Sequence, residues 1–340
     1  MDEFAIIRRL TEGRQTPAFQ KERGIVTGIG DDAAVANLTS GCQLVMTCDT
    51  MTEEIHFKKI TMRDTDIGYK AMAAAVSDIA AMGAIPRYAL ISLSFPKGTV
   101  LDKIESIYKG LYECADRFKV VIAGGDTTSA VQGITVAVTI IGEVERGKAL
   151  LRSVAKPGDV LFATGFLGLS AAGLQYLLDR GIPSGEWDEH SVTEAHSALV
   201  RAHCRPDPQI EAGQLLQRSG ICHALNDVSD GLASEAWEIA EASGVGIDLI
   251  EERIPVAGEL LVYAQQRELD ALDFILYGGE DYQLVGTMRE EHAAAMQAKF
   301  REAGLALHII GYVQTQPRGV RLVQSGGKVV SLEKKGYNHF

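Results

Sequence analysis

The sequence predicts a mixed α/β chain of two domains. Its 340 residues are 46% hydrophobic, which is enough to bury two cores, and a single core usually stops growing below this length. Helical and strand patterns alternate along the chain, and the alternation restarts after the turn sequence AKPGD at 155–159. We therefore expect a first domain at 1–150 and a second domain at 151–340.

The first half alternates between β-branched runs and segments with apolar residues at helical spacing. Asp64 suits the N-cap of an Ala- and Met-rich helix. The expected elements are a short helix at 2–12, a strand at 42–48, helices at 64–84 and 99–117, a strand at 87–95, a strand ending in a glycine turn at 119–129, and a strand at 133–144.

The second half repeats this alternation with the same two kinds of pattern. Strands are expected at 160–165, 223–227, 246–250, 281–288, 306–313 and 319–323. Helices are expected within 168–180 and 191–219, and at 231–243, 257–268 and 289–303.

An excess of acidic residues argues against two classes of partner. The chain has 33 Lys+Arg and 45 Asp+Glu, a formal net charge of −12, whereas nucleic acids and anionic membranes attract clustered positive charge. We expect neither partner. No apolar run is long enough to span a bilayer, and the N-terminus MDEFAIIRRLTEG has no signal-peptide core. Five cysteines without a CxxC pair complete the prediction of a cytoplasmic protein with free thiols.

Several acidic residues follow a predicted strand or stand in a glycine turn. Any one of them is better explained by turn formation or helix capping, but the set is harder to explain in that way. Strand ends in α/β layers are where ligands usually bind. The residues are Asp31 and Asp32 in GIGDD, Asp49 in TCDT, Asp78 in VSD, Asp126 in GGDTT, Asp227 and Asp230 in NDVSDG, and Glu280 and Asp281 in GGED.

If these carboxylates converge, they cannot all stay ionised without cations to neutralise them. Oxygen ligands favour Mg²⁺, Ca²⁺ or Mn²⁺ over Zn²⁺. Mg²⁺ usually binds one or two carboxylates and completes its shell with water and phosphate oxygens. A convergent set therefore predicts several ions and a polyphosphate. The glycine turns would let backbone N–H groups approach the phosphates.

The common nucleotide-binding and hydrolytic motifs do not account for this pattern. GEVERGKA at 142–149 has the spacing of a P-loop but ends in Ala149, where a metal-binding Ser or Thr is required, so we interpret it as a hairpin turn. The sequence has no HRD or DFG motif, dinucleotide fingerprint or Ser–His–Asp set. Hydrolysis through a covalent nucleophile is therefore not expected.

The motifs as an ordered set resemble those of the bacterial thiamine-monophosphate kinases, a family in the superfamily of aminoimidazole ribonucleotide synthetase. The set is specific although its single members are weak, and the resemblance runs from about residue 20 to the C-terminus. In chain order the motifs are GIGDDAAV, TCDT, VSDIAAMGA, GGDTT, SDGL and YGGEDY, followed by the C-terminal KGYNHF.

Other functions remain alternatives to this one. Selenophosphate synthetases resemble this layout but carry a reactive Cys or selenocysteine and a Lys in an N-terminal loop, and no such pair precedes Gly28 here. Hydrogenase-maturation members end in a cysteine, and the purine-synthesis members lack the SDGL and GGEDY pairing. From a different class, the acidic turns alone would also suit a non-enzymatic divalent-metal-binding module.

The resemblance implies ATP-dependent phosphorylation of thiamine monophosphate to thiamine diphosphate, with several Mg²⁺ ions. It also implies a homodimer in which the first domains pair their sheets into a barrel near the ATP, and a second domain that completes the active-site cleft. The implied Mg²⁺ ligands are Asp32, Thr47, Cys48, Asp49, Asp78, Asp126, Asp227 and Asp230. The implied ATP contacts are Tyr108, Gly125, Asp126, Arg152 and Ser229. The implied substrate contacts are His56, Glu280 and Tyr337.

Two positions depart from the family pattern. Cys48 stands where the family often has Thr, and because a thiol is a poor magnesium ligand, only its backbone carbonyl would serve. Lys334 lies where relatives often place an aromatic residue suited to stacking on a cationic ring, and Tyr337 is the nearest aromatic residue.

The implied reaction needs no general base, so no catalytic residue is assigned. The nucleophile would be a phosphate-monoester oxygen whose second pKa is about 6, so it is largely ionised near neutral pH. The remaining barrier is electrostatic, because one anion must attack another, and bound Mg²⁺ neutralises both. We expect direct in-line transfer, with Glu280 near the positive thiazolium ring of the substrate.

Overall fold

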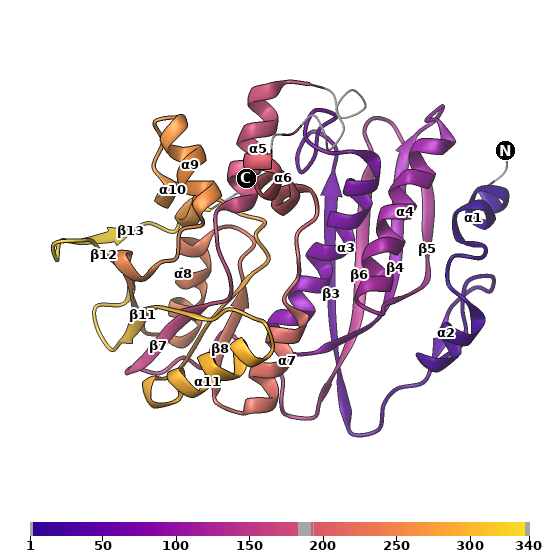
Figure 1. Cartoon of the computed structure of the whole chain (residues 1–340). Coiled ribbons are helices and arrows are strands. Elements are labelled where there is room, and N and C mark those ends of the chain that lie inside the picture. Colours follow the sequence, from indigo (N-terminus) through magenta and orange to yellow (C-terminus); the bar gives the residue numbers. More distant parts are fainter. Residues whose placement is uncertain (1–2, 183–191, 193, 337–340) are drawn as a thin grey trace. The chain divides into compact units, whose positions relative to one another are not determined.

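The computed structural model describes residues 3–182, 192 and 194–336, and these residues form two compact units (Figure 1). The described residues up to Ile79, together with Ile85–Gly147 and Ile182, form the first unit. Ala80–Ala84, Lys148–Gly181 and the described residues from 192 onward form the second. Each unit has its own sheet and is described by itself.

The first unit is built on a four-stranded sheet in the order β3-β6-β4-β5. Strands β4 and β5 are parallel neighbours joined by helix α4, and the other pairings are antiparallel. The bounds are β3 (Cys42–Thr52), α3 (Asp64–Ala81), β4 (Ile85–Pro96), α4 (Leu101–Arg117), β5 (Val121–Ala130) and β6 (Thr135–Glu145).

Helices α3 and α4 contact each other through their backbones on one face of this sheet. A Cβ atom on Gly68 of α3 would lie 1.8 Å from the Ile107 carbonyl oxygen of α4. A Cβ atom on Gly110 of α4 would lie 1.7 Å from the Thr65 carbonyl oxygen of α3. Only glycine fits at these two positions.

The other face of the first unit's sheet is only partly covered by the described residues of that unit. Tyr88 of β4 is buried there in a small core with Ile25, against which Phe19 packs. Phe19 belongs to α2 (Pro17–Glu22) and Ile25 to β1 (Ile25–Thr27), and Ala36 of β2 (Val35–Ala36) also packs against this core. The chain begins with α1 (Glu3–Thr11). On the same face, Met46 of β3 and Leu90 of β4 are 68% and 38% exposed.

The second unit contains a seven-stranded sheet in the order β13-β12-β9-β11-β7-β10-β8. Only β9 and β12 pair in parallel. The strands are β7 (Asp159–Ala163), β8 (Cys222–Asp227), β9 (Gly246–Ile250), β10 (Leu284–Arg289), β11 (His308–Gln314), β12 (Gly319–Val323) and β13 (Val329–Leu332). The helices are α5 (Leu169–Arg180), α6 (Glu194–Cys204), α7 (Ile210–Ser219), α8 (Leu232–Ser243), η2 (Glu251–Arg253), α9 (Gly258–Gln266), α10 (Ala271–Tyr277) and α11 (Glu290–Glu302).

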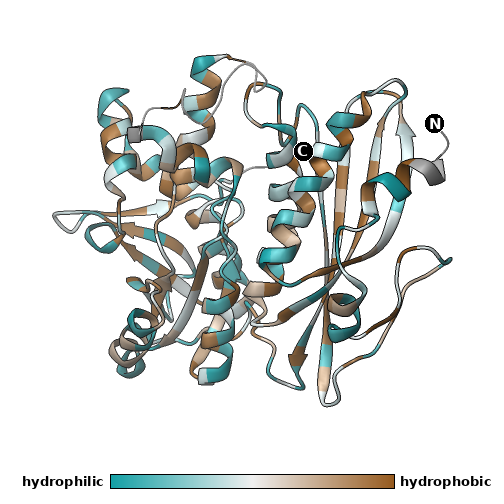
Figure 2. Ribbon diagram, turned by 45° about the vertical axis from the view of Figure 1, so that its right-hand side comes forward, coloured by the Kyte–Doolittle hydropathy of each residue, from teal (hydrophilic) through white to brown (hydrophobic). Residues whose placement is uncertain are grey.

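Helices cover both faces of this second sheet. Leu161 of β7 joins the core formed with α5, α8, α9 and α10, whereas Phe162 joins the core formed with α7 and α11. Alternate residues of a strand point to opposite faces, so a strand buried on both sides becomes apolar throughout, as β7 is. Figure 2 shows helices that carry both hydrophilic and hydrophobic residues, as expected of helices that cover a sheet.

Most predicted elements are present with small shifts of their ends, and two turn predictions are wrong. The segment 142–149 is not a hairpin turn, because β6 continues to Glu145 and the next strand, β7, belongs to the sheet of the other unit. The glycine turn expected within 119–129 is a continuation of β5, which runs through Gly125 to Ala130. A Cβ atom on Gly125 would lie 1.9 Å from the Ile91 carbonyl oxygen, so this glycine allows close contact with β4 and does not reverse the chain. The short β1–β2 pair, α2, η2, α10 and β13 were not predicted from the sequence.

Candidate functional site

In the first unit, strand β3 and helix α3 bring two aspartates and a threonine together. Thr47 and Asp49 alternate with outward-pointing residues of β3 and lie on the sheet face that carries α3. The Thr47 hydroxyl donates a hydrogen bond to the Asp78 carboxylate of α3. Burial, followed by the charge of Asp78, raises the pKa of Asp49 from 3.8 to about 7. The charge on one of these carboxylates therefore makes ionisation of the other less favourable.

This group fits a hard divalent cation. Two carboxylates and a hydroxyl supply only oxygen donors, the type that Mg²⁺ prefers. The raised pKa of Asp49 shows that the pair resists holding two negative charges by itself, and a cation would relieve that repulsion. Among the described residues, no three His, Cys, Asp or Glu side chains converge closely enough to enclose a metal ion. Water and phosphate oxygens would have to complete the coordination.

The structure does not bring Asp126 to this pair. Asp126 of β5 pairs with Ser92 of β4, whereas Asp49 shares its face of the sheet with Ile91. Neighbouring residues of β4 point to opposite faces, so Asp126 lies on the face opposite Asp49. Its neighbour Thr127 points inward and hydrogen-bonds the hydroxyl of Tyr108, whose pKa burial raises to about 12.

Three further positions of the first unit lie in exposed or loop settings. Asp32 is exposed, and its backbone N–H donates to the Asp31 carboxylate at 2.8 Å, so Asp31 braces the turn. The Cys48 side chain is exposed and points away from Thr47 and Asp49, which leaves only its backbone to face that pair. His56 accepts a hydrogen bond at Nδ1 from the Thr52 N–H at 3.0 Å, so its proton is on Nε2.

In the second unit, the NDVSDG and GGED motifs form two loops that are hydrogen-bonded to each other. The Glu280 N–H donates to the Ser229 carbonyl oxygen at 2.7 Å, and the Tyr282 N–H donates to the Val228 carbonyl oxygen at 2.9 Å. Asp227 at the end of β8 is buried. Glu280 has a left-handed backbone with φ of 64°, an unusual conformation for a side-chain-bearing residue that is often found at functional sites.

Glu280 and Asp281, the two acidic residues of GGED, have different contacts. Asp281 is buried, and its carboxylate accepts hydrogen bonds from the backbone N–H groups of Gly168 at 2.6 Å and Ser170 at 3.1 Å, where α5 begins. This is a helix-capping role. The Glu280 carboxylate instead lies 3.7 Å from Nδ1 of the buried His203, which is 3.4 Å from the Ser170 hydroxyl.

A hydrogen-bonded network that the sequence analysis missed surrounds Asp227. The buried carboxylate of Glu235, on α8, accepts from the Ser229 hydroxyl at 3.2 Å, from the Asp230 N–H at 3.1 Å and from the Asn226 amide. Burial raises the pKa of Glu235 to about 8, and the charges of Asp227 and Glu238 add to the effect. Asn226 and Glu235 adjoin quoted motifs, but nothing in the sequence alone places them against the loop.

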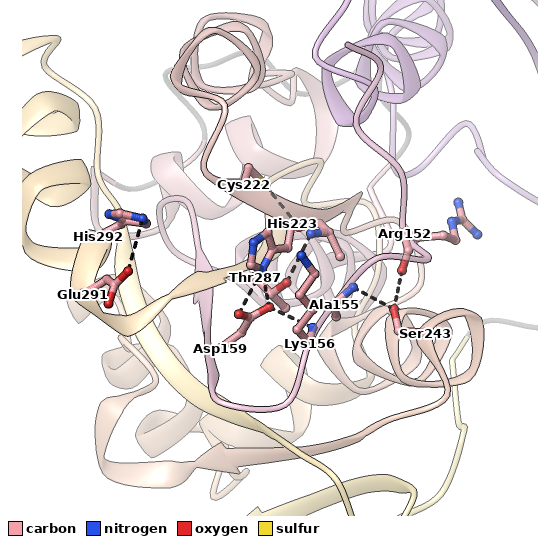
Figure 3. A network of polar contacts seen from close by, with 11 residues as sticks. Arg152, Ala155, Lys156, Asp159, Cys222, His223, Ser243, Thr287, Glu291 and His292 are labelled. Carbon is pink, nitrogen blue, oxygen red and sulfur yellow. Dashed lines mark hydrogen bonds and ion pairs between the residues drawn. The ribbon is translucent and has the colours of Figure 1, made fainter. Parts of the chain in front are cut away.

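Arg152 joins this network from the segment that precedes β7. The Leu225 N–H donates to the Leu151 carbonyl oxygen at 3.1 Å, which holds this segment against β8. The Ser243 hydroxyl donates to the Arg152 carbonyl oxygen at 3.1 Å and accepts from the Ala155 N–H at 3.1 Å (Figure 3). The Arg152 guanidinium then reaches the Glu238 carboxylate at 2.5 Å.

A second polar group lies at the starts of β7 and β8, whereas Asp227 ends β8. The Asp159 carboxylate is buried and lies 2.8 Å from His223 Nδ1 (Figure 3). The neighbouring Cys222 thiol is buried and hydrogen-bonds the Ala224 carbonyl oxygen. Cys222 and His223 therefore serve separate partners. Among the remaining predictions, Tyr337 lies outside the described residues, and Lys334 pairs with Glu241 of α8 at 2.8 Å.

Comparison with known proteins gives consistent matches over the whole chain. Residues 30–144 match the AIR synthase related protein N-terminal domain, and residues 156–324 match the AIR synthase related protein C-terminal domain. The thiamine-monophosphate kinase of Bacillus subtilis (strain 168) is 40% identical over 340 residues, which is 100% of both chains.

Solved structures agree with this result. The crystal structure of thiamine-monophosphate kinase from Stenotrophomonas maltophilia K279a has a TM-score of 0.80 and 34% sequence identity, over 95% of this chain and 96% of that one. A structure of AaThiL complexed with AMPPCP and TMP has a TM-score of 0.77 and 30% identity, over 99% and 97% of the two chains.

Proposed function

The chain belongs to the thiamine-monophosphate kinase family, and on that premise we propose that it phosphorylates thiamine monophosphate to thiamine diphosphate with ATP. The observation that carries this function is the 40% identity with the Bacillus subtilis enzyme over the full length of both chains. The related structure that holds AMPPCP and TMP supports the same two substrates. The ordered motifs and the two-unit fold agree with it.

Several Mg²⁺ ions would assist the transfer. Thr47, Asp49 and Asp78 supply the oxygen donors in the first unit, and Asp227 and Asp230 supply carboxylates in the second. When bound, Mg²⁺ neutralises charge on the phosphates and aligns donor and acceptor. Asp32, Asp126 and the backbone carbonyl of Cys48 remain proposed ligands.

The remaining roles follow from the charge and position of the side chains. Arg152 and Ser229, joined through the Glu235 network, would contact the nucleotide, as would Tyr108 and Gly125. Glu280, His56 and Tyr337 would bind thiamine monophosphate, whose thiazolium charge suits the Glu280 carboxylate. The phosphate of this substrate needs no general base, because it is already largely ionised near neutral pH. We propose that it attacks ATP directly, without a phosphorylated enzyme.

The test is ADP release from ATP and Mg²⁺ with a panel of acceptors. We expect turnover with thiamine monophosphate and none with thiamine, formylglycinamidine ribonucleotide or selenide. Preference for either of the last two would assign the chain to another branch of the superfamily. Metal binding without ADP release would make it a non-enzymatic module. A phosphorylated side chain trapped in a single turnover would contradict direct transfer.

We also propose a homodimer formed through the open face of the first unit's sheet. Met46 and Leu90 are exposed on neighbouring parts of that face, and exposed apolar surface on a regular sheet favours association. Met46→Glu should convert the dimer to a monomer in sedimentation velocity. Val131→Glu, at a side chain that is 95% exposed outside the strands, is the matched control and should leave the dimer intact.

The five cysteines are free, at Cys42, Cys48, Cys114, Cys204 and Cys222, which supports a reducing compartment such as the cytoplasm. No helix in the described part of the chain is both long and apolar enough to cross a membrane.

A further inference from the structure

The carboxylate of Glu235 is buried from solvent and directed at the loop that precedes α8. It is only 2% exposed, and it accepts hydrogen bonds from a hydroxyl, a backbone N–H and a side-chain amide. Burying a carboxylate among neutral donors is costly and is retained where its hydrogen bonds are needed. Here both bonds of Oε1 go to consecutive residues, Ser229 and Asp230.

Ordinary helix capping does not explain this arrangement. The N-cap residue of α8 is Gly231, which has φ of 106° and makes no side-chain cap. Glu235 lies one turn into the helix and reaches back beyond the N-cap to the loop. Its side chain therefore fixes the path of residues 229–230 more than it starts α8.

Asn226 connects this carboxylate to Arg152. Its Nδ2 donates to the Glu235 carboxylate and also to Glu238 Oε2 at 3.2 Å. The same Glu238 oxygen accepts from Arg152 Nη1 at 2.5 Å. One hydrogen-bonded chain therefore runs from Arg152 through Glu238, Asn226 and Glu235 to the Ser229–Asp230 loop.

We infer that Glu235 and Asn226 are positioning residues. Their hydrogen bonds hold the Ser229–Asp230 loop and the Arg152 guanidinium in fixed positions relative to each other, so that both can bind the magnesium nucleotide. This inference rests on the proposed function for its ligand. Neither residue needs to touch the substrates. Outer-shell hydrogen bonds of this kind fix the direction of the groups that bind directly, and losing them commonly lowers metal affinity or activity about 10–100-fold.

The test compares Glu235→Ala, Glu235→Gln and Asn226→Ala with wild type. Asp248→Asn is the control, because Asp248 is also a buried, hydrogen-bonded carboxylate of the second unit but pairs with Arg321 on neighbouring strands. The kinetic measurement is the KM for Mg-ATP separately from the KM for thiamine monophosphate. The second measurement is hydrogen exchange at the Asp230 amide in nucleotide-free protein.

Glu235→Ala should raise the KM for Mg-ATP about 10–100-fold and leave the KM for thiamine monophosphate within about twofold. The Asp230 amide should exchange faster because its acceptor is gone. Glu235→Gln keeps an oxygen toward Ser229 and Asp230 and should recover most of the loss. Asn226→Ala should weaken Mg-ATP with slower Asp230 exchange than Glu235→Ala, since the Glu235 acceptor remains.

An unchanged KM for Mg-ATP and unchanged Asp230 exchange in Glu235→Ala would overturn the inference. Equal increases of both KM values, matched by Asp248→Asn, would also overturn it, because they would reflect general destabilisation. If Glu235→Ala does not fold, Asn226→Ala decides the question: a selective rise in the KM for Mg-ATP supports the inference, and an unchanged KM for Mg-ATP overturns it. Failure of the proposed function is distinct, since wild type itself would then release no ADP with thiamine monophosphate.

Discussion

The two units present acidic residues in different ways. In the first unit, a strand and a helix hold Asp49 and Asp78 against each other with one threonine hydroxyl between them. In the second unit, Asp227 and Asp230 belong to a loop that is held by a buried glutamate, an asparagine and a second loop. Regular elements can place charges without extra bonds, whereas a loop needs dedicated partners to hold its shape.

This difference predicts that the first-unit pair is the more sensitive to single changes. Asp78→Asn should lower kcat by about 10³-fold and weaken Mg-ATP binding, because it removes one of the two carboxylates proposed to bind Mg²⁺ in the first unit. Circular dichroism should show an unchanged fold. Asp31→Asn is the matched control, as Asp31 braces a turn, and it should stay within about fivefold of wild type.

Asp126→Asn tests whether a residue on the opposite face of the same sheet belongs to the site. We expect loss of turnover and weaker Mg-ATP binding as for Asp78→Asn, since both are proposed magnesium ligands. A near-normal kcat would remove Asp126 from the ligand set and leave the Asp49–Asp78 face as the first unit's contribution.

In the second unit, substitutions of the adjacent residues Glu280 and Asp281 should have different effects, the first on substrate binding and the second on stability. Glu280→Gln should raise the KM for thiamine monophosphate about 10-fold and spare Mg-ATP, because it removes the charge proposed to face the thiazolium ring. Equal loss for both substrates would make Glu280 structural.

Asp281→Asn is the counterpart to that change. It removes the charge from the group that caps α5, so we expect a loss of about 1 kcal/mol in the free energy of unfolding. Urea denaturation measures it, and both KM values should stay near those of wild type. A selective rise in the KM for thiamine monophosphate would instead place Asp281 at the substrate.

The smallest expected effects are on stability against pH in metal-free protein. The folded pKa values of Asp49 and Glu235, about 7 and about 8, lie above their unfolded values of 3.8 and 4.5. Each protonated group therefore favours the folded state at low pH, and that contribution is lost as the pH rises through its folded pKa. We expect the melting temperature to fall between about pH 4 and pH 8.

Single variants distinguish the contribution of Asp49 to this pH dependence from that of Glu235. Asp49→Asn should flatten the part of the fall centred below pH 7, and Glu235→Gln should flatten the part nearer pH 8. Added Mg²⁺ should stabilise wild type more at pH 8 than at pH 5, because the ionised pair binds it. A Mg²⁺ effect independent of pH would argue against the Asp49–Asp78 pair as a ligand group.

The sequence by itself determined the mixed α/β class, most helices and strands in the described part of the chain, and the motifs that identify the family. Periodicity and motif order are local properties, and they can be seen without knowing what packs on what. The same local information also predicts that Asp31 stabilises its own turn, since its carboxylate accepts a hydrogen bond from the N–H of the next residue, Asp32.

Only the tertiary structure decided which acidic residues are neighbours. Asp49 and Asp78 meet because β3 and α3 pack together, and Asp126 lies apart from them because of strand register. In the sequence, nothing distinguishes Glu235 from other glutamates in helices. The structure shows that its position on α8 directs its carboxylate at the Ser229–Asp230 loop. A side chain's partners depend on packing and register, and both are set by contacts between distant parts of the chain.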